Sequence, residues 1–228
     1  MLRRRIWERQ RSRLLVSVAE KKNTPRIYVL AGPNGGGKSS IAGAAVKQQG
    51  VEYFNPDEAA AQILTVNQHI SIEEAQSAAW YEGKRLLERA IAERLDYAFE
   101  TTLGGNTIAA LLEQAMSSEV EVRLWYVALS SLDLHVERVH ARVARGGHNI
   151  PEERIRERYT SSLINLIHLM PKLTELRVYD NSLDADPNDG ERPEPHLIVH
   201  VDHGKVVSMC ELALTPDWAK PLVVAALR

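Results

Sequence analysis

The chain has 228 residues, of which 44% are hydrophobic and 25% are charged, and its formal net charge is −2. This length suits one substantial α/β core and is short for two domains, and the composition is typical of a soluble globular protein. No apolar run approaches the roughly 18–20 residues that span a bilayer, and charged residues interrupt the first segment as a signal peptide. We therefore expect a cytoplasmic protein without membrane contact. A single cysteine, Cys210, excludes an intrachain disulfide.

Charge is unevenly distributed along the chain. Residues 1–24 contain eight Lys and Arg and two Glu, so the remainder carries a net charge of −8. A basic arm of this kind can hold a nucleic acid or an acidic protein, or it can be a solvated extension. We favour the extension and expect no nucleic-acid partner, because no RNA- or DNA-binding motif accompanies the arm. We predict a basic extension over 1–24 and a single domain over 25–228.

Strands and helices are predicted to alternate through this domain. Apolar, β-forming runs predict strands over 26–31, 51–55, 97–101, 120–129 and 176–179. Helical periodicity and capping signals predict helices over 38–48, 71–95, 132–144 and 151–169, with two more beginning near Asp57 and ending near Met116. A loop over 183–195 and a β-hairpin of 196–202 with 206–212 complete the chain. Alternation of this kind predicts an α/β fold whose parallel sheet is sandwiched between helices.

A glycine-rich turn lies between the first predicted strand and the helix after it. Residues 32–39, Gly-Pro-Asn-Gly-Gly-Gly-Lys-Ser, match the phosphate-binding pattern G-x-x-x-x-G-K-[ST]. Glycines let the backbone turn its N–H groups inward, Lys38 reaches the β- and γ-phosphates, and the Ser39 hydroxyl can ligate Mg²⁺. The predicted ATP-binding residues are Gly32, Pro33, Asn34, Gly35, Gly36, Gly37, Lys38, Ser39, Ser40 and Arg145. The motif predicts a P-loop NTPase-type fold that binds ATP and Mg²⁺.

Two carboxylates follow neighbouring predicted strands. Asp57 comes just after the second strand and Glu100 ends the third, where it precedes Thr101 and Thr102. Acids at the carboxyl ends of parallel strands can take a proton from an acceptor hydroxyl or hold a metal. Asp57 could instead cap its helix, a role that Asp also favours. No hydrophobic run ending in Asp-Glu appears at the position in the chain where many motor ATPases have one, which favours a small kinase.

The predicted helix 132–144 carries basic residues on one face. Arg138, Arg142 and Arg145 recur at helical spacing beside an apolar stripe, and Gly146-Gly147 follows. Arginines in this arrangement can neutralise the charge that develops during phosphoryl transfer, and the glycines can hinge the helix as a lid. A solvated basic face paired with nearby glutamates is the alternative. His148 could contact the nucleotide or cap the turn.

Six motifs follow one another in a characteristic order along the chain. They are Gly-Pro-Asn-Gly-Gly-Gly-Lys-Ser-Ser (32–40), Phe-Asn-Pro-Asp (54–57), Phe-Glu-Thr-Thr-Leu (99–103), Arg138 and Arg142 before Gly-Gly-His-Asn-Ile-Pro (146–151), Arg158-Tyr159 and Tyr-Asp-Asn-Ser (179–182). Together they resemble the zeta-toxin family. Members of that family are P-loop kinases of toxin–antitoxin systems, and they phosphorylate the sugar of UDP-N-acetylglucosamine.

The resemblance implies a role for each matched residue. Asp57 would be the general base on the sugar hydroxyl, while Lys38 and Ser39 would hold ATP and Mg²⁺. Glu100 would touch substrate or metal, with Thr101 and Thr102 beside it in the substrate site. Arg138 and Arg142 would supply the cations that stabilise the phosphate. The resemblance also implies a nucleotide-sugar acceptor and an antitoxin protein as partners.

Three hypotheses remain open from the sequence. The first is a zeta-like kinase acting on a UDP-activated amino sugar. The second keeps the chemistry but changes the acceptor to another metabolite or a nucleic-acid end. The third is a nucleotide-binding regulatory module without transfer activity, in which Asp57 and Glu100 are structural.

Overall fold

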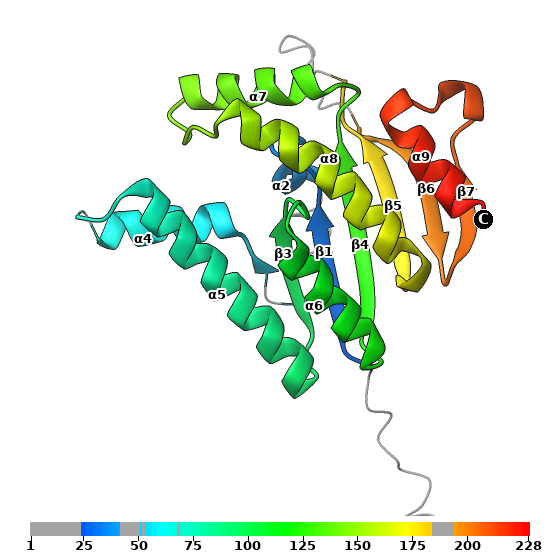
Figure 1. Ribbon diagram of the computed structural model, residues 1–228, viewed down its shortest axis with the longest axis horizontal. Helices are drawn as coiled ribbons and strands as arrows, with labels where there is room; N and C mark the ends of the chain where they lie inside the picture. The colour runs from blue at the N-terminus through cyan, green and yellow to red at the C-terminus, as the bar shows by residue number, and fades with distance from the viewer. Residues whose placement is uncertain (1–23, 42–50, 52, 68, 184–193) are drawn as a thin grey trace, which may run out of the picture.

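A computed structural model describes residues 24–41, 51, 53–67, 69–183 and 194–228, with the side chains of 40 and 41 excepted. Its central feature is a seven-stranded sheet in the order β2-β3-β1-β4-β5-β6-β7 (Figure 1). The strands are β1 (Arg26–Ala31), β2 (Tyr53–Phe54), β3 (Tyr97–Thr101), β4 (Glu121–Ala128), β5 (Glu175–Asp180), β6 (His196–Asp202) and β7 (Lys205–Met209). The α-helices are α2 (Lys38–Ile41), α4 (Pro56–Val66), α5 (Ile72–Glu93), α6 (Asn106–Ser117), α7 (Leu132–Ala144), α8 (Glu152–Leu169) and α9 (Lys220–Ala226).

The first five strands of the sheet are parallel. β1 lies at the centre, where Ile27 pairs with Tyr97 of β3 and with Val122 of β4. β6 and β7 run antiparallel and form the predicted C-terminal hairpin at one edge. This mostly parallel sheet flanked by helices confirms the predicted fold class. Because parallel strands end at the same edge, the loops after β1, β2, β3, β4 and β5 all meet there.

Alternation along the strands divides the core between the two faces of the sheet. Ile27, Val29 and Ala31 point to one face, where α5, α6, α8 and α9 cover a large apolar core. Figure 1 shows α5, α6 and α8 lying across this face. Tyr28 and Leu30 point to the other face and pack with residues of β3 and β4. Burial on both faces explains why β1 reads as a continuous apolar run in the sequence.

Local signals in the sequence account for several helix boundaries. Ser71 and Glu74 form the predicted capping box at the start of α5. α7 has the predicted bounds, and the Ser131 side chain caps it. For α4, however, the cap is Asn55, whose Oδ1 accepts hydrogen bonds from the backbone N–H groups of Asp57 and Glu58. The capping role considered for Asp57 is therefore wrong, since Asn55 already occupies the cap position.

Other elements differ from the sequence-based expectation. β2 is shorter than the predicted strand over 51–55, and β7 ends at Met209 rather than Leu212. Short 3-10 turns at Met170–Lys172, Leu212–Leu214 and Asp217–Ala219, together with α9, were not predicted. Most of the basic extension, the end of the predicted helix 38–48 and most of the predicted loop 183–195 lie outside the described residues. Among the described residues, no helix combines the length and the apolar character that crossing a membrane requires.

Candidate active site

The glycine-rich turn joins the end of β1 to the start of α2, as its motif predicts. Gly32, Gly35 and Gly37 have φ angles of 139°, 80° and 78°, a region that favours glycine. The turn also lies close to its neighbours. A Cβ atom on Gly32 would be 2.0 Å from the carbonyl oxygen of Val127, and one on Gly35 would be 2.5 Å from that of His135. The first and fourth residues of the motif must therefore be glycine for steric reasons as well as conformational ones.

Side chains hold three carbonyl groups of the turn. Lys38 Nζ donates to the oxygen of Pro33 at 3.2 Å. His135 Nδ1 lies 2.7 Å from the oxygen of Asn34. Asn181 Nδ2, from the segment after β5, donates to the oxygen of Gly36 at 3.0 Å. The turn is thus fastened from its own helix, from α7 and from the end of β5.

Glu100 is the centre of a polar cluster beside the turn. Its Oε2 accepts hydrogen bonds from Ser39 Oγ at 2.8 Å, from Tyr53 OH at 2.9 Å and from Asn55 Nδ2 at 3.3 Å. Lys38 Nζ lies 3.6 Å from its Oε1, and the two side chains are only 8% and 11% exposed. A buried carboxylate needs such partners to offset its lost hydration. Burial and the charge of Glu100 raise the pKa of Tyr53, so this phenol stays a donor.

Asp57 lies in the first turn of α4, and it lines one cavity together with Lys38 and Glu100. Arg142 Nη1 of α7 is 3.5 Å from its Oδ2, and His148 Nε2 is 3.9 Å from its Oδ1. The Asp57 side chain is 51% exposed, so it is accessible to a substrate. His148 therefore lies beside Asp57.

Arg138 and Arg142 of α7, and Arg145 at its C-cap, make different contacts. Arg138 donates to the carbonyl oxygens of Asn181 at 2.8 Å and Ser182 at 3.3 Å. Arg145 Nε donates to the carbonyl oxygen of Ala141, within its own helix. Arg142 reaches Asp57 through Nη1, while its Nε and Nη2 are buried and have no hydrogen-bond partner in the part of the chain that the structure describes. Donors in that state suit an anionic ligand.

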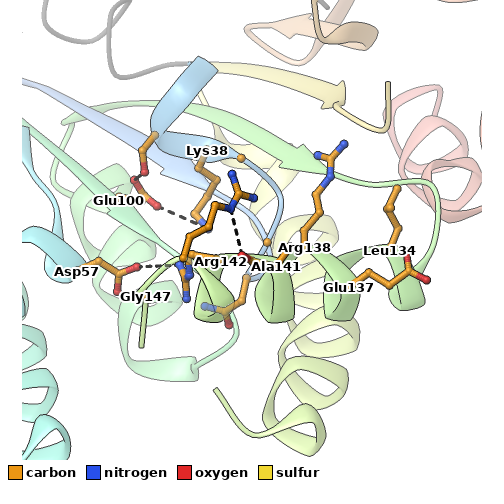
Figure 2. Close-up of a pocket in the computed structure, with 14 residues that line it drawn as sticks. Lys38, Asp57, Glu100, Leu134, Glu137, Arg138, Ala141, Arg142 and Gly147 are labelled. Atoms are coloured by element: carbon orange, nitrogen blue, oxygen red, sulfur yellow. Dashed lines mark hydrogen bonds and ion pairs between the residues drawn. The ribbon is translucent and has the colours of Figure 1, made fainter. Parts of the chain in front are cut away.

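These side chains surround one cavity of about 700 Å³, shown in Figure 2. Figure 2 shows Lys38 and Glu100 on one side and the side chains of α7 on the other. The lining residues are Asn34, Gly35, Gly37, Lys38, Ser39, Asp57, Glu100, Leu134, Glu137, Arg138, Ala141, Arg142, Arg145 and Gly147. Thr101 and Thr102 are not among them, and Thr101 Oγ1 accepts from the N–H of Leu103. Gly32, Pro33 and Gly36 are not among the lining residues either, and the side chain of Ser40 is not described.

Several residues that support the cavity have no individual role among the sequence-based predictions. Tyr53 and Asn55 orient Glu100, and Arg158 Nη1 of α8 donates to Asn34 Oδ1 at 3.2 Å. His135 and Asn181 hold the glycine turn. Asn55 precedes a proline at the start of a helix, which is a recognisable capping signal. The others act across long sequence separations, and the motifs that contain Arg158 and Asn181 do not reveal their partners.

A chain of contacts connects the C-terminal segment to this site. Trp218 Nε1 donates to Asp180 Oδ2 at 2.7 Å, and the other carboxylate oxygen accepts from the N–H of Ser182 at 2.8 Å. Ser182 Oγ in turn accepts from the N–H of Ser130 at 2.6 Å, at the end of β4. Trp218 therefore stabilises, through Asp180, the turn at 181–182 whose carbonyl oxygens accept hydrogen bonds from Arg138.

The site supplies few metal ligands of its own. Within the described ranges, no cluster of three or more His, Cys, Asp or Glu could hold a metal ion. Ser39 Oγ and Glu100 Oε2 are nevertheless adjacent oxygen donors beside the phosphate loop. Mg²⁺ in nucleotide sites uses one or two protein oxygens together with phosphates and water. The residues present therefore fit a Mg²⁺ ion that arrives with a nucleotide.

The fold and the phosphate loop define the class, which is that of the P-loop proteins. Residues 27–161 match the family model described as "AAA domain", which spans more than half of the chain. The chain belongs to this family. An uncharacterised protein of Haemophilus influenzae is 28% identical over 166 residues, which is 70% of this chain and 100% of that protein.

Solved structures of similar fold support the same class. A chain of the AvrRxo1-ORF1:AvrRxo1-ORF2 complex is 17% identical with a TM-score of 0.64, and the match covers 92% of this chain and 69% of the other. A related structure of that complex was determined with ATP. A chain of the PezAT chromosomal toxin–antitoxin system of Streptococcus pneumoniae is 17% identical with a TM-score of 0.54, over 76% of each chain. This chain thus has a P-loop kinase-like fold.

Proposed function

We propose that the protein is an ATP-dependent phosphotransferase that phosphorylates a hydroxyl group of a small molecule. The observation that carries this proposal is the presence of Asp57 and the phosphate loop in one cavity, with Arg142 between them. A protein that only binds a nucleotide requires the phosphate loop, but it does not require an accessible carboxylate in the same cavity. A kinase needs both, since the acceptor hydroxyl must lie next to the γ-phosphate.

ATP would bind with its phosphates over the glycine turn and the first turn of α2. Lys38 now contacts Glu100 and Pro33, and it would move to the β- and γ-phosphates. Arg138 and Arg142 line the same cavity and would neutralise phosphate oxygens. Arg145 is exposed at the end of the same helix and would contact the outer part of the nucleotide.

Ser39 and Glu100 would hold the Mg²⁺ ion that accompanies ATP. When bound, such an ion supplies positive charge to the phosphates and orients them. Ser39 would ligate it directly, and Glu100 would ligate it or accept a hydrogen bond from its water. Tyr53 and Asn55 would keep the Glu100 carboxylate in place through the hydrogen bonds that they donate to it.

Transfer would proceed by direct displacement. The acceptor oxygen forms a bond to the γ-phosphorus as the bond from that phosphorus to the bridging oxygen of ADP breaks. The hydroxyl proton passes to the Asp57 carboxylate, and ADP leaves with the electrons of the broken bond. Lys38, Arg138 and Arg142 stabilise the charge that spreads over the transferred group. To act, Asp57 must exchange its Arg142 contact for the acceptor hydroxyl.

For the acceptor, we propose a UDP-activated amino sugar, UDP-N-acetylglucosamine being the first to test. The support is the resemblance of the ordered motifs to zeta toxins, together with a fold shared with the PezAT structure. We likewise propose a protein partner that acts as an antitoxin, because both similar structures come from two-protein systems. Residues 25–228 would form the single kinase domain that carries these activities.

The test is to incubate the protein with γ-labelled ATP, Mg²⁺ and a small-metabolite extract, and to identify labelled products by mass spectrometry. A labelled nucleotide sugar would support the full proposal. A different labelled metabolite would keep the kinase and replace the acceptor. ATP binding without transfer to any component of the extract would favour the regulatory module instead. An extract treated with phosphatase before the assay controls for acceptors that already carry phosphate.

A further inference from the structure

His135 is a fully buried histidine whose two ring nitrogens both contact backbone. Nε2 accepts a hydrogen bond from the N–H of Leu129 at 3.0 Å, so it carries no proton. Nδ1 lies 2.7 Å from the carbonyl oxygen of Asn34, which can only accept, so Nδ1 carries the proton. The surroundings thus fix one neutral tautomer. Burial lowers the pKa of His135 to about 4, in agreement with a ring that stays neutral.

This histidine also forms the surface against which the glycine turn packs. A Cβ atom on Gly35 would be 2.5 Å from the His135 carbonyl oxygen, and one on Gly36 would be 3.6 Å from its ring carbon Cε1. On the other side, the Tyr159 ring of α8 meets the imidazole edge-on, with 5.4 Å between ring centres. The imidazole is therefore enclosed by its neighbours. This packing restricts the orientation of the ring in which Nδ1 donates to Asn34.

The bond to Asn34 has a consequence for the next residue of the loop. In a trans peptide unit the C=O of one residue and the N–H of the following residue point in opposite directions. When His135 holds the Asn34 carbonyl, the Gly35 N–H points away from the His135 ring. Gly35 lines the cavity, and the proposal below assigns this N–H to the phosphates. Asn181 acts in the same way on the peptide unit of Gly36 and Gly37.

We propose that His135 is a positioning residue that presents the Gly35 N–H to the nucleotide phosphates and fixes α7 relative to the phosphate loop. Arg138 and Arg142 lie one and two turns further along α7, so the same contact sets the position of both arginines over the loop. This proposal rests on the proposed ATP-binding function. It assigns to His135 an effect on nucleotide affinity that a histidine serving only as core packing would not have.

Two substitutions separate the two hydrogen bonds of the ring. The side-chain amide of His135→Asn can occupy the position of Nδ1 and donate to Asn34, but it does not reach Leu129. The longer amide of His135→Gln can place its oxygen where Nε2 accepts from Leu129, and it loses the bond to Asn34. Each variant therefore retains one buried hydrogen bond and loses one, so the two are matched in their expected cost to stability.

The experiment measures the dissociation constant of Mg·ATP by titration calorimetry for wild type and both variants, with thermal unfolding as the check on folding. We expect His135→Gln to weaken binding about tenfold and His135→Asn to restore most of that loss. Equal affinities in the two variants would overturn the inference. Wild-type protein that bound no ATP would overturn the proposed function, and the inference with it.

Nuclear magnetic resonance of the unaltered protein keeps the inference testable if either variant fails to fold. With ¹⁵N-labelled histidine, the His135 ring should show the Nδ1–H tautomer at neutral pH, and the Gly35 amide signal should shift when Mg·ADP is added. An Nε2–H tautomer would contradict the assignment, and so would a Gly35 amide signal that does not shift when Mg·ADP is added.

Discussion

Arg142 of α7 and Asp57 of α4 face each other across the cavity, with 3.5 Å between Nη1 and Oδ2. Their side chains are 38% and 51% exposed, so the pair is partly hydrated and contributes little to the free energy of unfolding. Nε and Nη2 of the same guanidinium are buried without a hydrogen-bond partner among the described residues. A pair of this kind can separate at small cost, which would release Asp57 to an acceptor and Arg142 to a phosphate.

Asp57→Asn should abolish most phosphoryl transfer while leaving ATP affinity unchanged. The amide cannot take the acceptor proton, and the loss of a general base costs about 10²–10⁴-fold in turnover. Turnover is measured with the acceptor identified by mass spectrometry, and ATP affinity by calorimetry. Glu58→Gln is the matched control, because Glu58 is the next residue in the same helical turn and does not line the cavity. Full turnover in Asp57→Asn would remove Asp57 from the mechanism.

Ser39→Ala should raise the Mg²⁺ concentration needed for half-maximal activity. The substitution removes a hydroxyl ligand and also the 2.8 Å hydrogen bond that orients Glu100. By comparison with other perturbed metal sites, we expect a shift of about tenfold or more. Ser117→Ala, which removes an exposed hydroxyl on α6, is the control. An unaltered Mg²⁺ dependence would mean that Ser39 is not a ligand.

Gly35→Ala should lose ATP binding and destabilise the fold. The new Cβ would be 2.5 Å from the His135 carbonyl oxygen, and φ is 80° at this position. Strain of this type costs about 1–3 kcal/mol, which urea denaturation can measure. In Gly105→Ala the Cβ meets nothing within 4 Å, so only a change in the α6 cap of under about 1 kcal/mol is expected. Equal effects of the two substitutions would argue against close packing of the loop on α7.

Stability should fall as pH drops from about 6.5 toward 4, and His135 should account for part of the fall. Burial lowers the pKa of His135 from 6.5 to about 4, so within this window the unfolded chain binds a proton that the folded protein does not. The contribution is present above pH 6.5 and declines with acid, by at most about 1.4 kcal/mol per pH unit. His135→Asn removes it. Urea denaturation at several pH values should therefore give a shallower pH dependence for this variant, and parallel curves would contradict the assignment.

Residues that act through local patterns could be predicted from the sequence. The phosphate loop is a contiguous motif, and the Ser71–Glu74 capping box and the bounds of α7 follow from near neighbours. Asp57 and Glu100 could be placed because parallel strands end at one edge of a sheet, and both line the cavity.

The contacts of His135 and Asn181 with the glycine turn could not be predicted, because their partners lie 101 and 145 residues away in the chain. One signal was nevertheless present for His135, since it interrupts the apolar stripe of α7 between Leu132 and Val139. The cap of α4 was predictable from Asn55-Pro56, but the neighbouring Asp57 was considered in its place. β2 is short at the sheet edge, where few neighbours fix its bounds, and α9 is short and carries no capping side chain.

The bond between Trp218 and Asp180 bears on how the protein can be shortened. The family match ends at residue 161, within α8, so the chain could be trimmed soon after β5 and still contain the whole match. Such a fragment would keep every residue of the phosphate loop together with Arg138, Arg142 and Arg145. It would lose the Trp218 indole that donates to Asp180. The turn at 181–182, to which Arg138 donates its hydrogen bonds, would then lose this support. A useful expression fragment must therefore extend through Trp218 and the helix that follows it.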